Sequence, residues 1–315
     1  MWLLLKNPEQ RATILTRTTE IMQNNLWMYL ILCMFIGFLS VVFRGLRSVL
    51  MIEPLGYKVT KINSYHAAMI GYLANFAFPR LGEVLRCTIL QKYEKVPFQK
   101  SLGTVITERV IDMILFGVLF LIALGLESKK LLFFMEENMS LTVMFSGMGK
   151  LVVFGLIVGI FILILLFRKK ILKWAIYQKI RKFLKGFWDG LISIKDLKKP
   201  FLFVVYSLLI WVCYYLMFYV CTFAFPDLAV LGTKGVILAS LACVVIGTLG
   251  FATPIPGGVG VYPILISKAF VLYGIDENLG GAIGTIIWTT ETLMYVVLGL
   301  VSVLIILRKK DKIKV

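Results

Sequence analysis

The stretch FLFVVYSLLIWVCYYLMFYVCTFAF, Phe201–Phe225, contains no charged residue and is long enough to cross a membrane. A helix of about 20 apolar residues spans the hydrocarbon core of a bilayer. Backbone polar groups cannot stay unpaired in lipid, so a membrane-spanning block must belong to a helix or to a closed barrel. Barrel strands are short segments of alternating polarity, so this block must be helical. The other blocks that meet this length are Leu26–Phe43, Ser101–Leu126, Leu141–Phe167, Val230–Ala252 and Leu279–Leu307. The sequence therefore predicts an all-α protein, a polytopic bundle of membrane helices.

The composition agrees with this prediction. Of 315 residues, 59% are hydrophobic and only 16% are charged, whereas soluble domains carry roughly 25% charged residues. The chain has no room for a separate soluble catalytic domain. Its single histidine, His66, argues against hydrolase triads and is expected to be a hydrogen-bonded packing residue. The cysteines show no metal or redox spacing and are expected to be reduced packing residues: Cys33, Cys87, Cys213, Cys221 and Cys243.

The net charge of +17 predicts the orientation of the chain and an affinity for anionic lipid. The basic residues lie between apolar blocks and no nucleic-acid motif accompanies them, so nucleic acid is not an expected partner. The densest basic segment, 168–200, and the basic tail, 308–315, are predicted to be cytoplasmic, at a cell (inner or cytoplasmic) membrane. By alternation, 44–61 and 92–100 lie inside, whereas 127–140 and the N-terminus lie outside. Apolar residues at helical spacing in 172–191 predict an amphipathic helix in the cytoplasmic interface, or a solvated linker helix packed on the bundle.

One layout occurs twice: an apolar segment, a Pro/Gly break and a shorter helix. Its members are Ile62–Phe78, Pro79–Glu83 and Val84–Tyr93, then Val230–Ala252, Thr253–Gly260 and Tyr262–Tyr273. The predicted orientation approaches the two breaks from opposite sides, as in inverted repeats whose broken helices meet near the midplane of transporters. We therefore expect a polar segment 1–24 and one transmembrane domain, 25–307. Its repeats are about 25–126 and 201–307, joined by the 141–167 span and the 168–200 segment.

Ionisable residues inside the apolar blocks are the first candidates for function. Each costs roughly 2.5–3.5 kcal/mol on insertion scales and is usually functional. The first group, Arg80, Glu83 and Arg86, can form a ladder on one helix face; the alternative is snorkelling to the interface. The second group, Glu108, Arg109 and Asp112, opens a span, where Arg109 and Asp112 can pair. Its alternative is a place at the membrane surface.

Glu291 lies alone in the middle of the last span, too deep to reach an interface. It requires an arginine partner (Arg80, Arg86 or Arg109) or must be protonated.

The glycine-rich stretch Pro256–Gly260 lacks both nucleotide-binding motifs. It can unwind a helix and expose backbone N–H groups at the start of the following helix, and such groups bind phosphate. Together with the forked guanidinium groups of Arg80 and Arg86, this end suits a phospholipid headgroup. The alternative is a tight helix break that serves packing alone.

Four motifs occur in order: RGLR (44–47), NFAFPRLGEVLR (75–86), ERVID (108–112) and PIPGGVG (254–260). From about Leu26 to Leu307 the chain resembles the transmembrane region of lysylphosphatidylglycerol synthases, the flippase-like domain family. The resemblance implies an eight-helix unit with inverted repeats, which in the best-known members moves an aminoacylated phospholipid between leaflets. With the arguments above, it gives these candidate headgroup-binding residues: Asn75, Arg80, Glu83, Arg86, Glu108, Arg109, Asp112, Pro256, Gly257, Gly258, Gly260 and Glu291. No metal or cofactor is expected.

Three departures from the family pattern qualify this expectation. Relatives usually begin with another spanning helix, for which only Met1–Leu5 could stand here. Many carry an acidic residue after the glycine-rich element, where this chain has Tyr262 and Pro263. The sequence ends at Val315 and so lacks the aminoacyl-transferase domain of bifunctional members.

Two functions follow from the sequence. The favoured one is transport or binding of an anionic or zwitterionic phospholipid, or of a polyprenyl-phosphate-linked lipid, without ATP hydrolysis; a separate enzyme is then expected to modify the lipid. The alternative is a membrane-embedded enzyme or accessory subunit of cell-envelope lipid or glycan synthesis. The acidic pairs that face outside, Glu136-Glu137 and Asp276-Glu277, have no His, Asn or further Asp beside them.

Overall fold

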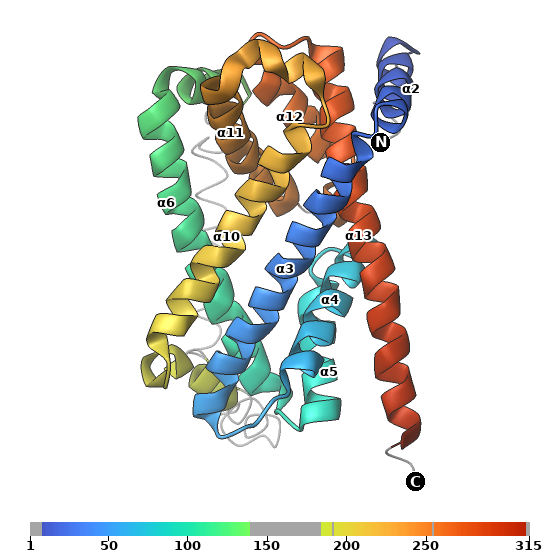
Figure 1. Cartoon of the computed structure of the whole chain (residues 1–315). Coiled ribbons are helices and arrows are strands. Elements are labelled where there is room, and N and C mark those ends of the chain that lie inside the picture. Colours follow the sequence, from blue (N-terminus) through green and yellow to red (C-terminus); the bar gives the residue numbers. More distant parts are fainter. Residues whose placement is uncertain (1–7, 139–183, 191, 254, 313–315) are drawn as a thin grey trace, which may run out of the picture.

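The computed structural model describes residues 8–138, 184–190, 192–253 and 255–312, and within these ranges every regular element is a helix (Figure 1). Four long helices run the length of the bundle: α3 (Trp27–Ile52), α6 (Phe98–Asn138), α10 (Pro200–Thr222) and α13 (Glu277–Lys312). Five segments are long and apolar enough to cross a membrane, namely Trp27–Leu55, Phe98–Phe134, Pro200–Thr222, Pro226–Phe251 and Glu277–Arg308. The predicted all-α, multi-pass architecture is confirmed. The predicted span 141–167 and the amphipathic part of 168–200 up to residue 183 lie outside the described residues.

Two helical hairpins occupy opposite halves of the bundle (Figure 1). The first pairs α4 (Lys61–Ala77) with α5 (Leu81–Glu94), and the second pairs α11 (Gly232–Ala252) with α12 (Val261–Val271). At 1.5 Å per residue α5 is about 21 Å long, too short to cross a bilayer. The predicted breaks are confirmed, and α4 contacts the short helix η4 (Pro256–Gly258) inside the second break. The inverted repeat that these hairpins suggest remains a prediction.

The first break is shorter than its sequence predicts, because only Phe78, Pro79 and Arg80 separate the two helices. Glycines make this tight turn back feasible. A Cβ atom on Gly82 would collide with the carbonyl oxygen of Gly71 on the facing helix, so the two backbones touch here. The side-chain oxygen of Asn75 then accepts a hydrogen bond of 2.8 Å from the N–H of Gly82 and caps the start of α5. Proline, glycine and asparagine therefore define this hairpin tip.

Helix α3 continues beyond the predicted end of its apolar block at Phe43. Arg44 and Arg47 were expected to open an inside loop, but both lie within the helix and are buried. The loop itself comprises only residues 53–60, beginning with the short helix η1 (Glu53–Leu55). This helical extension was not predicted because arginines normally end a membrane span, whereas these two have acidic partners inside the protein.

The described segments for which the sequence predicts an inside location gather at one end of the bundle, the lower end in Figure 1. This end carries loops 53–60 and 95–97, the η2 region (Ser193–Asp196) and the end of α13. Helix 184–190 packs closely against the first turns of α6, because Gly190 lies against backbone atoms of Lys100 and Gly103. The lower end is thus the one for which the sequence predicts a cytoplasmic location.

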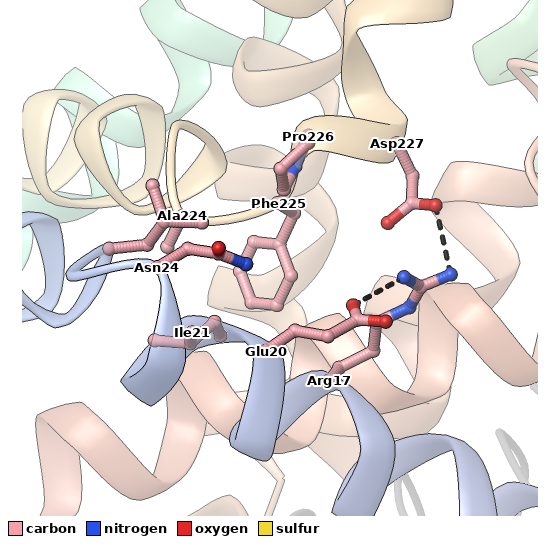
Figure 2. A pocket seen from close by; sticks show the side chains of 9 residues that line it. Arg17, Glu20, Ile21, Asn24, Ala224, Phe225, Pro226 and Asp227 are labelled. Carbon is pink, nitrogen blue, oxygen red and sulfur yellow. Dashed lines mark hydrogen bonds and ion pairs between the residues drawn. The ribbon is translucent and has the colours of Figure 1, made fainter.

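The upper end carries the helix α2 (Pro8–Gln23), where the sequence predicted only a polar segment. Arg17 on α2 forms ion pairs with Glu20 (2.6 Å) and with Asp227 (2.9 Å) on the short helix η3 (Pro226–Leu231). Figure 2 shows these side chains around a small cavity of about 100 Å³. Helix α2 is therefore attached to the second half of the bundle.

Apolar side chains fill the main core around α10, α11, α12 and α13. All five cysteines are buried and free, and His66 makes a 3.0 Å hydrogen bond with the Ser302 hydroxyl. The packing roles expected for these residues agree with the structure.

Candidate functional site

Five charged side chains meet inside the bundle: Arg44, Arg47, Arg86, Glu108 and Asp112, here called the charge cluster. They come from α3, α5 and α6, and all five residues are buried. Removing an ion from water costs several kcal/mol, so buried charged groups are usually paired with opposite charges. Glu108, for which the sequence left a place at the membrane surface as the alternative, is buried inside the protein at 1% exposure.

Asp112 receives hydrogen bonds from both arginines of α3. Its Oδ2 atom lies 2.9 Å from Nη1 of Arg44 and 3.1 Å from Nη2 of Arg47, and its Oδ1 atom lies 2.6 Å from Nη1 of Arg47. Arg47 also donates to the hydroxyl of Ser207 on α10 at 3.3 Å. The two arginines lie three residues apart, on one face of α3, so a single carboxylate can engage both.

Glu108 forms a two-pronged pair with Arg86. Nη1 and Nη2 of the guanidinium donate to the two carboxylate oxygens, each at 2.9 Å. Arg47 adds an ion pair to Glu108 at 3.8 Å and so joins the two halves of the cluster. Three arginines against two carboxylates leave one formal positive charge buried.

A row of tyrosines extends the cluster toward α13. Arg44 donates to the hydroxyl of Tyr214 at 3.0 Å, and that hydroxyl lies 3.2 Å from the hydroxyl of Tyr72. The Tyr72 ring stacks on Tyr295 with centroids 4.8 Å apart. The polar interior is therefore continuous from the charge cluster to the last helix.

The second break packs against the tip of the first hairpin. The indole N–H of Trp288 donates to the carbonyl oxygen of Gly257 at 2.8 Å. Gly257 has a φ of 58°, and a Cβ atom there would collide with the ring of Phe76 near the end of α4. A glycine is required both by the left-handed backbone and by this close approach.

Glu291 lies beside this junction. It follows Trp288 by three residues and precedes Tyr295 by four, so all three share one face of α13. Tyr295 in turn contacts Phe76, with ring centroids 6.1 Å apart. Among the described residues Glu291 has no ion pair or hydrogen bond, and the expected arginine partner is not found.

The remaining predicted charges pair differently from the sequence expectation. Arg109 does not pair with Asp112; its Nε atom lies 2.9 Å from Glu83 on α5. The Arg109 side chain is 43% exposed and that of Glu83 is 28% exposed. Arg80 is exposed, has a φ of 65°, and forms no ion pair or hydrogen bond with any described residue. The ladder of Arg80, Glu83 and Arg86 is absent, because Glu83 and Arg86 turn to different partners on α6.

The other glycines of the second break also have left-handed backbones, with φ of 65° at Gly258 and 80° at Gly260. Pro256 begins η4, and α12 begins directly after Gly260. A helix start leaves its first N–H groups without partners inside the helix. Their use for binding an anion remains a prediction, as does the binding role of Asn75.

Several residues of this interior were not predicted from the sequence as site residues: Arg44, Arg47, Tyr72, Ser207 and Tyr214. The available signal was the pair of arginines at three-residue spacing, followed by Ser48 and then by apolar residues as far as Ile52. No sequence signal marks the two tyrosines, because aromatic residues are common throughout these helices.

The sequence of the chain matches the model of one family of membrane proteins over most of its length. The model of the lysylphosphatidylglycerol synthase transmembrane region matches residues 1–299. The chain belongs to this family. Three of the four motifs that carried the resemblance contribute to the charge cluster: RGLR provides Arg44 and Arg47, the second motif provides Arg86, and ERVID provides Glu108 and Asp112. The corresponding searches found no matching curated protein and no matching solved structure.

Proposed function

We propose that this member of the lysylphosphatidylglycerol synthase transmembrane-region family moves a phosphate-bearing lipid between leaflets. The observation that carries the proposal is the meeting of the two hairpins, where the tip of α4 packs on the second break. Discontinuous helices that meet in this way form substrate sites in secondary transporters, because their free backbone groups can bind charged substrates. The same tip presents Arg80, which has no partner among the described residues.

Arg80 is the residue that we propose to bind the lipid phosphate. It sits at the start of α5, about 21 Å along that helix from the lower end. A left-handed backbone is unfavourable for arginine, and strained residues of this kind often occur at functional sites. Its guanidinium fork matches two phosphate oxygens. Both the position and the chemistry of Arg80 therefore suit a headgroup passing the hairpin tip.

Arg109 provides a second cation for this headgroup. It lies eleven residues after the start of α6, about 16 Å along the helix and close to half the thickness of a bilayer. Only its Nε atom is engaged by Glu83, which leaves its two terminal nitrogens available among the described contacts. An arginine at this depth is unfavourable against lipid alone, so it requires a polar path or an anionic ligand.

Arg86, in contrast, is proposed to be part of a fixed scaffold. Both of its terminal nitrogens are committed to Glu108, and its side chain is 6% exposed. The charge cluster then keeps α3, α5, α6 and α10 in register, while Arg80 and Arg109 contact the substrate. This division of roles differs from the sequence prediction, which gave Arg80 and Arg86 the same role.

We further propose that the basic lower end is cytoplasmic and that the protein resides in the cell membrane, as the distribution of lysine and arginine indicates. The chain performs no chemistry on the lipid, which another enzyme produces or modifies.

The proposal is tested with the full chain in proteoliposomes that contain a headgroup-labelled phospholipid. An impermeant reagent that reacts only with the outer leaflet follows the loss of protected lipid without ATP. We expect protected lipid to become accessible faster than in protein-free vesicles. If vesicles with and without the protein expose the labelled lipid at the same rate, for every phospholipid and polyprenyl phosphate tested, transport is refuted. A chemically altered lipid would support the membrane-enzyme alternative.

A further inference from the structure

A groove of about 650 Å³ opens at the upper end of the bundle, between the final part of α6 and helix α12. The described residues that line it are Lys129, Lys130, Phe133, Lys268, Val271, Leu272 and Glu277. This volume is in the range of sites that hold small molecules. The groove is formed where α6 bends at Glu127, whose backbone angles (φ −135°, ψ 40°) are not helical.

The lysines of this groove are unusual for their end of the molecule. The structure describes six basic side chains there: Arg11, Arg17, Lys129, Lys130, Lys234 and Lys268. It describes as many acidic ones: Glu9, Glu20, Glu127, Asp227, Asp276 and Glu277. The upper end as a whole is thus balanced, but half of its bases line a single groove. This concentration favours an anionic ligand.

Two of these lysines differ in how they are held. The ammonium of Lys130 lies 3.1 Å from a carboxylate oxygen of Glu127 and 3.7 Å from the ring centroid of Tyr273, so its position is fixed. Lys129 is exposed and forms no ion pair with a described residue. One cation is therefore oriented and one is available for a ligand.

Both helices of the groove also present accessible apolar side chains. Phe133 is 55% exposed and Val271 is 47% exposed, and both line the groove with the lysines. A soluble anion makes no use of such side chains, whereas an amphiphile contacts them with its acyl chains. Cations next to exposed apolar residues at the end of membrane helices are the arrangement that binds anionic lipid.

We propose that this groove binds the phosphate of an anionic phospholipid at the upper surface of the membrane. Lys129, Lys130 and Lys268 contact the phosphate, and Phe133, Val271 and Leu272 contact the chains. The site is separate from the hairpin tips. Its binding of lipid can be measured without movement of lipid between leaflets, so it is tested independently of transport.

The test follows thermal stabilisation of the detergent-solubilised full chain by added ligand. The probes are short-chain phosphatidylglycerol, phosphatidylcholine with the same chains, and inorganic phosphate. The variants are Lys129→Gln, Lys129→Gln with Lys268→Gln, and Phe133→Asn. Lys234→Gln is the matched control, since Lys234 is an exposed lysine of the same end that does not line the groove.

We expect the apparent Kd for phosphatidylglycerol to rise about fivefold for each lysine removed, so about 25-fold in the double variant. Lys234→Gln should change it less than about twofold, and Phe133→Asn should weaken lipid binding. If the double variant loses stability before ligand is added, the single Lys129→Gln variant decides, because Lys129 has no ion pair with a described residue to lose. Equal effects of Lys234→Gln and Lys129→Gln would overturn the proposal. Stabilisation by phosphatidylcholine equal to that by phosphatidylglycerol would overturn it too. A third contrary result would be that the lipids do not stabilise the protein, whereas inorganic phosphate does and the lysine variants abolish its effect.

Discussion

Replacing Asp112 by Asn should be among the most damaging conservative changes in this protein. Asp112 accepts three hydrogen bonds from Arg44 and Arg47, at 2.6 to 3.1 Å, and lies in a cluster that already carries one more cation than anions. The amide keeps the shape of the side chain but removes its charge. Three arginines then share a single carboxylate, Glu108. Breaking a buried ion pair from one side costs about 3–5 kcal/mol, because the remaining charge stays buried.

The change is measured by the melting temperature of the purified protein in detergent. A loss of 1 kcal/mol lowers Tm by about 2–4 °C in domains of 150–250 residues, so Asp112→Asn should lower it by at least about 6 °C. The control is Asp276→Asn, an exposed aspartate whose Oδ1 accepts a hydrogen bond from the N–H of Leu279. Asparagine caps a helix as well as aspartate does, so the control should keep its Tm.

Because the cluster has one more cation than anions, removing a cation should cost less stability than removing an anion. Arg47→Met leaves two balanced pairs, Arg44 with Asp112 and Arg86 with Glu108, and puts a side chain of similar size in place of the arginine. The four charges that remain then cancel, so no buried charge is left without an opposite charge. Arg47→Met should therefore lower Tm less than Asp112→Asn does. The reverse order, or a Tm for Asp112→Asn within about 2 °C of the Asp276→Asn control, would show that the cluster is not held by charge balance.

Three further predictions follow from the same contacts. Gly82→Ala should destabilise the first hairpin strongly, because its Cβ meets the Gly71 carbonyl oxygen; Gly117→Ala, with nothing within 4 Å, should raise or preserve Tm. Glu291→Gln should leave Tm within about 2 °C of the wild type, since no described arginine pairs with Glu291, and a loss like that of Asp112→Asn would reveal a partner. Single cysteines introduced at positions 185 and 227 should react with impermeant reagents from opposite sides of the membrane. The five native cysteines are buried and should add little background. Reaction of both positions from the same side would refute the proposed topology.

How far the sequence predicts this structure depends on the kind of signal. The helix breaks were predictable because Pro79, Gly82 and the Pro256–Gly260 stretch interrupt apolar segments in a way that few conformations tolerate. The end of α3 was not predictable, because an arginine need not end a membrane span when another helix provides an acidic partner for it. Asp112 supplies that partner, and it lies 65 residues from Arg47 in the chain.

The pairing of charges was also beyond local reasoning. Arg109 and Asp112 stand three residues apart on one helix, which favours a pair, but each finds a better partner elsewhere. The choice of partner depends on how α3 and α5 pack against α6, and the spacing of residues within one helix does not predict that packing. The sequence therefore singled out the charged candidate residues, whereas their contacts required the structure.

The measurement that bears most directly on the central proposal is lipid movement by three arginine variants in proteoliposomes. Arg80→Gln should abolish movement of the labelled phospholipid while Tm stays within about 2 °C, because Arg80 has no partner among the described residues. Arg80→Lys should restore part of the rate, since it keeps the charge but lacks the fork. Arg11→Gln, which removes an exposed arginine of α2, should transport at the wild-type rate. Wild-type transport by Arg80→Gln would contradict the account.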